Sequence, residues 1–96
     1  MISQHNVLIR DRISDKNHQL SLRRKIQQIL SDVSGLPTTD FRDLHAELSP
    51  GMLDSLEYLE AIVKIEIAFS TEFSDEEVSR LKSIQSIINS LNNRTR

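Results

Sequence analysis

The residues best placed to do chemistry are Asp54 and Ser55, which lie in the segment GMLDSLE, residues 51–57. Asp54 can cap a helix that begins at Ser55, because Glu57 follows three residues later and completes a capping box. A hydroxyl at Ser55 would then be exposed at the positive end of the helix dipole. Free N–H groups there favour negative charge, so a phosphodiester formed on this serine would be stabilised. Taken alone, the segment is also explained by an ordinary helix start.

Other kinds of catalytic or metal site have no support in the sequence. The three histidines, His5, His18 and His45, are too scattered to form a ligand pair on one helix face. Cysteine is absent, which excludes disulfides, thiolate zinc sites and cysteine nucleophiles. There is no glycine-rich phosphate loop and no G-x-S-x-G nucleophile elbow. We therefore expect no metal site and no enzyme that acts unaided.

Length and composition predict one all-α domain. The chain has 96 residues, of which 38% are hydrophobic, enough for one small core. Only 4% are aromatic, fewer than a β-sandwich or a base-stacking nucleic-acid platform usually needs. Both glycines and both prolines lie in the window 35–51. This clustering predicts helices that are interrupted by a single long loop.

The first helix is predicted over residues 20–34. Its apolar residues recur at helical spacing and form one stripe: Leu22, Ile26, Ile29, Leu30 and Val33. Gly35, with Pro37 just after it, is a helix stop signal. The loop 35–53 follows, and its apolar residues are expected to hold it against the core, with one short helical turn: Phe41, Leu44 and Leu48.

A second helix is predicted over residues 54–70, with a wide buried stripe of apolar residues and a solvent-exposed side. The predicted stripe consists of Leu56, Leu59, Val63 and Phe69, with Ile62 or Ile65. The solvent-exposed side consists of Glu57, Glu60, Lys64 and Glu66, where Glu60 and Lys64 have the spacing of an ion pair. Ile67 fits the buried stripe poorly and is expected to be exposed.

The last third of the chain predicts a short helix and a longer one. Ser74 and Glu77 form a capping box that opens a helix over 75–81. Ser83 can cap a helix over 84–92, whose apolar face comprises Ile84, Ile87, Ile88 and Leu91. The complete prediction is a small antiparallel four-helix bundle, three main helices plus one short helix, with a long first loop.

Three regions are predicted: a polar, flexible N-terminal extension at 1–18, the bundle at 19–92 and a tail at 93–96. No apolar run is long enough to span a membrane, and the N-terminus lacks the apolar stretch of a secretory signal. We expect a monomeric, cytoplasmic protein. Residues 1–34 carry a net charge of +3 and residues 35–96 a net charge of −5. The acidic part repels nucleic-acid phosphates and attracts basic protein surfaces.

The chain resembles the acyl carrier proteins and their peptidyl and aminoacyl carrier relatives. The resemblance runs without gaps across residues 53–91, and the helix near 22–34 falls where the family has its first helix. It is carried by Asp54-Ser55-Leu56, Glu60, Glu66, Phe69, the turn at 71–73, the capping box at 74–77 and Ser83-Ile84.

The resemblance implies a four-helix bundle in which Ser55 accepts 4′-phosphopantetheine from coenzyme A through a phosphopantetheinyl transferase. Asp54 matches the aspartate that helps to organise the metal and cofactor end of that transfer. The thiol of the arm then holds an acyl or aminoacyl group as a thioester. It is loaded by an acyl- or aminoacyl-loading synthetase and passed to downstream transferases. The carrier itself is not catalytic, and its lack of cysteine is compatible because the working thiol belongs to the arm.

The resemblance also implies that the second helix docks on partner enzymes, with an apolar residue near Val63 in a shallow pocket. The expected partner-binding residues are Glu57, Glu60, Val63, Lys64 and Ile67. Three features depart from fatty-acid carriers: Gly51 lies one residue earlier, Lys64 and Ile67 make the second helix less acidic, and an extension of about 18 residues precedes the minimal carrier. They favour a specialised or secondary pathway over primary fatty-acid synthesis.

Two alternatives stay open at this stage. One is a carrier-like bundle that is never modified and acts as an interaction or regulatory subunit. The other is a small helical nucleic-acid-binding protein that uses the basic residues between Arg10 and Lys25. The intact Asp54-Ser55-Leu56 disfavours the former, and the acidic residues 35–96 disfavour the latter.

Overall fold

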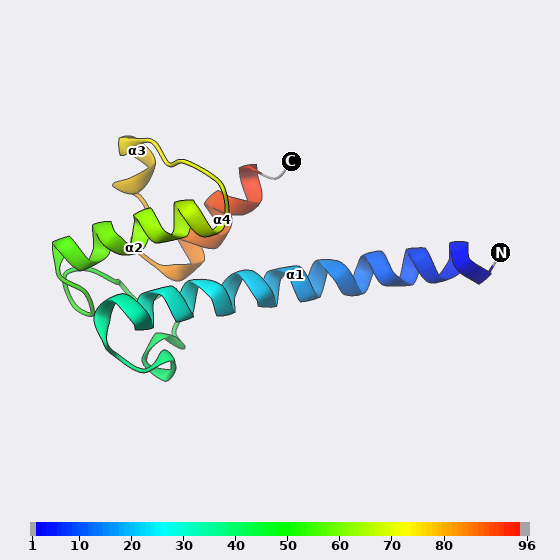
Figure 1. Ribbon diagram of the computed structural model, residues 1–96, viewed down its shortest axis with the longest axis horizontal. Coiled ribbons are helices and arrows are strands. Elements are labelled where there is room, and N and C mark those ends of the chain that lie inside the picture. Colours follow the sequence, from blue (N-terminus) through cyan, green and yellow to red (C-terminus); the bar gives the residue numbers. More distant parts are fainter. Residues whose placement is uncertain (1, 95–96) are drawn as a thin grey trace.

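The computed structural model describes residues 2–94, and for residues 2–17 it describes the backbone alone. Its elements in chain order are α1 (Ile2–Ser34), the 3-10 helix η1 (Thr38–Phe41), α2 (Ser55–Ala68), α3 (Asp75–Val78) and α4 (Ile84–Arg94). The helix α1 packs against α2, η1 and α4, and α3 lies beyond α2 (Figure 1). Strands are absent from residues 2–94, so the predicted all-α bundle of three main helices and one short helix is confirmed.

The helix α1 begins at Ile2, so the predicted start near residue 20 is wrong. Residues 2–34 contain no glycine or proline, and nothing in the backbone chemistry ends a helix before Gly35. Gly35 ends it as predicted, with φ at +79° and its N–H donated to the Ser31 carbonyl at 2.8 Å. The N-terminal half of α1 extends past the rest of the fold (Figure 1). The division into an extension at 1–18, a bundle at 19–92 and a tail at 93–96 stays a prediction.

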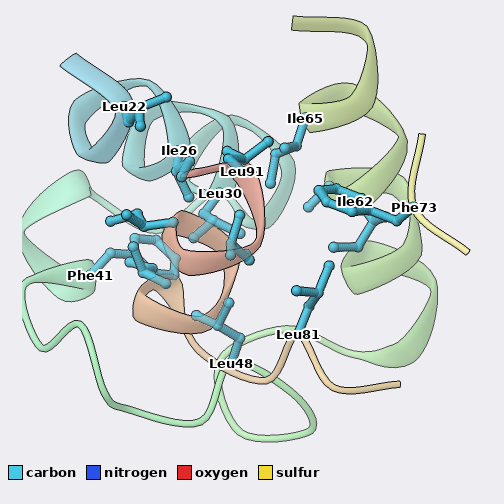
Figure 2. Packing of buried hydrophobic residues seen from close by; sticks show 14 of the residues in the cluster. Leu22, Ile26, Leu30, Phe41, Leu48, Ile62, Ile65, Phe73, Leu81 and Leu91 are labelled. Carbon is cyan, nitrogen blue, oxygen red and sulfur yellow. The ribbon is translucent and has the colours of Figure 1, made fainter. Parts of the chain in front are cut away.

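The core lies where α1, α2, α4 and the long loop meet (Figure 2). The predicted faces of α1 and α4 are confirmed, since each supplies a row of buried apolar side chains: Leu22, Ile26 and Leu30 from α1, and Ile84, Ile87, Ile88 and Leu91 from α4. The loop contributes Phe41 and Leu48, both buried, as predicted, while Leu44 is half-buried. The predicted helical turn in the loop is η1.

Hydrogen bonds fix the long loop on two sides. Gln27 on α1 donates its amide to the Phe41 carbonyl at 2.8 Å. On the other side, the Leu48 N–H is donated to the Lys82 carbonyl at 2.9 Å, and the Gln85 N–H to the Leu44 carbonyl at 2.9 Å. The loop is therefore held against both α1 and the start of α4, and its end at Leu53 and Asp54 fixes where α2 begins.

The predicted buried stripe of α2 is confirmed at Ile62, Ile65 and Phe69 but is wrong at its three other positions, because the helix is rotated from the expected orientation. Leu56, Leu59 and Val63 are 78%, 51% and 51% exposed. The side that faces the core instead carries Ala61, Ile62 and Ile65, which are buried, with Tyr58 and Phe69 half-buried. These five residues also follow helical spacing, so α2 has two apolar stripes and its period alone does not select one. Ile67 is 73% exposed, as predicted.

The short helix α3 ends at Val78, earlier than the predicted 81, although Leu81 is still buried just beyond it. Its capping box is confirmed, with the Glu77 N–H donated to Ser74 Oγ at 3.1 Å. The predicted cap of α4 is confirmed as well, because Ser83 Oγ accepts the Ser86 N–H at 3.2 Å. Across residues 2–94, no helix combines the length and the apolar character that crossing a membrane requires.

Candidate functional site

The start of α2 is built by a reciprocal capping box, as its sequence predicts. The Glu57 N–H is donated to Asp54 Oδ1 at 2.8 Å, and the Asp54 N–H is donated to Glu57 Oε1 at 3.0 Å. Asp54 has extended backbone geometry, with φ −78° and ψ 176°, as an N-cap residue should. The local sequence therefore sets both the first residue of the helix and the direction from which the chain enters it.

Ser55 is the first residue of α2 and is exposed. The N–H groups of Ser55 and Leu56 belong to the first turn, where no carbonyl of the same helix can accept them. They add to the positive end of a helix of 14 residues. The site thus combines an accessible hydroxyl with donors and a dipole that favour an anionic substituent.

A cavity of about 310 Å³ opens beside Ser55, between α2 and the α3 region. Its apolar wall comes from Tyr58, Leu59 and Val78. Its polar lining consists of Ser49, Ser55, Ser79 and Lys82. Sequence reasoning singled out Ser55 alone among these residues. The others lie up to 33 positions apart in the chain, and no local pattern could have indicated that they meet.

Tyr58 forms the boundary between this cavity and the core. Its side chain lines the cavity and also packs against the buried cluster. Its hydroxyl lies 2.8 Å from the Val78 carbonyl oxygen and 2.5 Å from the Leu81 carbonyl oxygen, and its single proton serves both acceptors. Burial raises the pKa of the Tyr58 phenol above its ordinary value of 10.0, so this donor stays protonated well above neutral pH.

The five expected partner-binding residues differ in their exposure to solvent and in whether their side chains are already hydrogen-bonded. Glu60, Val63, Lys64 and Ile67 are exposed along one side of α2, whereas Glu57 is half-buried and its carboxylate is engaged in the cap. The predicted Glu60–Lys64 ion pair is not formed; across residues 18–94, the ion pairs are Arg80–Glu76 and Arg94–Glu77.

Sequence reasoning missed two members of the same surface. Leu56 and Leu59, which were expected to be buried, lie in line with Val63 and Ile67. We call these four exposed apolar side chains the α2 ridge. It begins at the residue after Ser55 and runs to the last turn of the helix.

The carboxylates around Ser55 do not form a metal centre by themselves. Among the residues whose side chains the structure describes, no group of three or more His, Asp or Glu side chains is arranged to hold an ion. His18 and His45 are exposed and far apart in the chain, and the side chain of His5 lies outside the described residues. Asp54 and Glu57 supply two carboxylates beside the hydroxyl, so a cation at Ser55 would need further ligands from a bound phosphate or a partner.

Comparison with known proteins identifies the same region. The family model described as "Phosphopantetheine attachment site" matches residues 24–91, which include the whole of α2, α3 and the cavity residues. The acyl carrier protein of Buchnera aphidicola subsp. Schizaphis graminum is 29% identical over 76 residues, covering 79% of this chain and 96% of its own. The acyl carrier protein of Acidothermus cellulolyticus is 29% identical over 70 residues, covering 73% of this chain and 83% of its own.

Proposed function

This chain belongs to the phosphopantetheine-attachment family of acyl carrier proteins, which bear a 4′-phosphopantetheine prosthetic group, and we propose that Ser55 is the residue that carries it. The observation that carries the proposal is the placement of Ser55: exposed, first in α2, and directly after a capping aspartate. A phosphodiester at this point meets the free N–H groups of the first turn. Lys82, on the wall of the adjoining cavity, adds a positive charge on the same side.

The arm would supply the one nucleophile that the chain lacks, a thiol, since the sequence has no cysteine. With an acyl or aminoacyl group held on that thiol, the protein acts by position and not by catalysis. Tethering raises the effective concentration of the carried group at each partner enzyme. A phosphopantetheinyl transferase, a loading synthetase and downstream transferases are the partners that this role requires.

We propose that these partners recognise the protein by binding to the α2 ridge. It starts beside Ser55, so any enzyme that reaches the serine also meets Leu56 and Leu59. Glu60 and Lys64 lie next to the ridge with opposite charges and no ion pair between them, which leaves both available to a partner. Such rim charges act mainly on the rate of association and its salt dependence.

The proposed pathway is a specialised or secondary one and not primary fatty-acid synthesis. Lys64 and Ile67 reduce the acidity of the outward side of α2, and Gly51 lies one residue earlier than in fatty-acid carriers.

The test is enzymatic modification of the chain, followed by measurement of its intact mass by mass spectrometry. The chain is incubated with coenzyme A, Mg²⁺ and each of several phosphopantetheinyl transferases, and its mass is expected to rise by one phosphopantetheine. Ser55→Ala is expected to abolish the increase. Ser49→Ala is the matched control, because Ser49 lines the same cavity and its loss should leave modification intact. If no transferase modifies the wild type, the unmodified interaction subunit becomes the better description.

A further inference from the structure

The position of α3 depends on few apolar contacts. It has four residues and none of them is buried. Val78 is half-buried, and the nearest buried side chains in the sequence, Phe73 and Leu81, lie outside the helix, one before it and one after it. Segments with so little buried surface open at low free-energy cost, so the polar contacts of α3 decide where it lies.

Two sets of polar contacts hold the α3 region, one on each side. On the side away from Ser55, Glu77 is bound by Arg94 of α4. On the side of the cavity, the Tyr58 hydroxyl is donated to the Val78 and Leu81 carbonyls, at 2.8 and 2.5 Å. These carbonyls bracket the end of α3, so one side chain of α2 joins α2 to the whole segment 78–81.

The ring of Tyr58 also closes the space behind the cavity. Because the same ring lines the cavity and packs on the core, a group that moves from the cavity towards the core past Tyr58 must displace it. Displacement would break both hydrogen bonds of the hydroxyl. The Val78 carbonyl would keep the Leu81 N–H as a donor, at 3.1 Å, but the Leu81 carbonyl would lose its one described partner, which costs free energy.

We infer that Tyr58 is a specificity-determining residue that keeps the carried group outside the core and thereby selects small or polar acyl groups over long alkyl chains. The inference rests on the proposed function. The cavity of about 310 Å³ is at the lower limit of ordinary ligand pockets, and its lining combines three apolar residues with serine hydroxyls and one ammonium group. A short acyl or aminoacyl group matches that space and that polarity, whereas the distal methylenes of a long chain remain in water.

The experiment uses the full chain, first converted to the phosphopantetheine form and checked by mass. Acetyl, butyryl, octanoyl and dodecanoyl thioesters are then formed on the arm, and their cleavage by hydroxylamine is timed. In the wild type the dodecanoyl and butyryl rates are expected to agree within about twofold, because no further methylene is buried. In Tyr58→Ala the longer chains should be protected, by about fourfold for each methylene that enters the protein.

Phe69→Ala is the matched control, since Phe69 is also a half-buried ring of the α2 region but does not line this cavity. It should lower stability without making cleavage depend on chain length. If Tyr58→Ala does not fold, Tyr58→Leu removes the hydroxyl and part of the ring and is expected to protect long chains in the same direction.

Length-dependent protection in the wild type would overturn the inference, and so would identical behaviour of the wild type and the folded Tyr58 variant. Absence of the phosphopantetheine mass in the first step is a different result. It would reject the proposed function before any thioester is made.

Discussion

The Arg94 guanidinium donates to both carboxylate oxygens of Glu77 and so joins the end of α4 to α3. The same carboxylate accepts the Ser74 N–H at 3.0 Å and the Ser90 hydroxyl at 3.1 Å. Arg94 also donates to the Glu72 carbonyl, in the segment before α3. One ion pair therefore fixes the helix cap, the preceding turn and the last turn of α4 at the same point.

The Arg94–Glu77 pair predicts a specific acid dependence of stability. The hydrogen bonds from Arg94, then that from Ser74, lower the pKa of Glu77 from its ordinary 4.5 to about 2. Between these values the unfolded chain binds more protons than the folded one, so the stabilisation is present above about pH 4.5 and is lost as pH falls towards 2. Thermal unfolding followed from pH 6 to pH 2 should show this loss. Glu77→Gln should flatten it, and an equally steep decline in that variant would contradict the assignment to Glu77.

The two roles of Asp54, capping and charge, can be separated by substitution. Asp54→Asn keeps a good N-cap acceptor, so its unfolding free energy should stay close to wild type. Asp54→Ala removes the acceptor for the Glu57 N–H and should cost about 0.5–2 kcal/mol by denaturant unfolding. If the carboxylate also serves the modification of Ser55, both variants will be modified slowly although only one is destabilised. Normal modification of Asp54→Asn would restrict Asp54 to capping.

Ile65 and Ile67 provide an internal test of the orientation of α2. Ile65 is 0% exposed and Ile67 is 73% exposed, although both are isoleucines two positions apart on one helix. Ile65→Ala should cost about 2–5 kcal/mol, because it leaves a cavity in the core. Ile67→Ala should stay within about 0.5 kcal/mol. Chemical denaturation measures both, and the reverse order would mean that the core-facing side of α2 is not the one that carries Ile62 and Ile65.

The charges beside the α2 ridge should control association with a loading enzyme. Glu60→Lys is expected to slow loading of the phosphopantetheine form at low salt and to reduce its salt dependence, with an unchanged circular dichroism spectrum. Lys64→Glu should weaken the native pairing through a different contact, a carboxylate on the partner. Asp40→Lys, an exposed acidic position on η1, is the control for net charge. Equal rates for all four proteins across salt concentrations would exclude this side of α2 as the docking surface.

Removal of residues 1–17 should leave the bundle intact. The first side chain with a described hydrogen bond to another helix is Gln19, which exchanges amide hydrogen bonds of 3.2 Å with Asn92 on α4. We expect the melting temperature to fall by less than about 4 °C, the equivalent of less than about 1 kcal/mol in a domain of this size. A larger fall would mean that residues of the N-terminal segment, such as Val7, Leu8 and Ile9, pack on the bundle.

The sequence by itself determined the features that depend on residues three or four positions apart. The Asp54–Glu57 and Ser74–Glu77 boxes and the glycine that ends α1 are local, because each hydrogen bond forms within one turn. The buried stripes of α1 and α4 could also be predicted from the sequence, since the apolar residues of each helix occupy a single side of it. Ser55 could be singled out for the same reason: its exposure and its place on the dipole follow from the cap.

The tertiary structure decided what depends on contacts between distant segments. The helix α2 has apolar residues on two sides, and packing against α1 selected the side with Ile62 and Ile65, which left Leu56 exposed. The Tyr58 hydroxyl meets carbonyls 20 and 23 residues away. Lys82 and Ser55 line one cavity because the segment between α3 and α4 lies beside the start of α2. Such pairings require a specific packing of helices, and the periodicity of one segment carries no information about them.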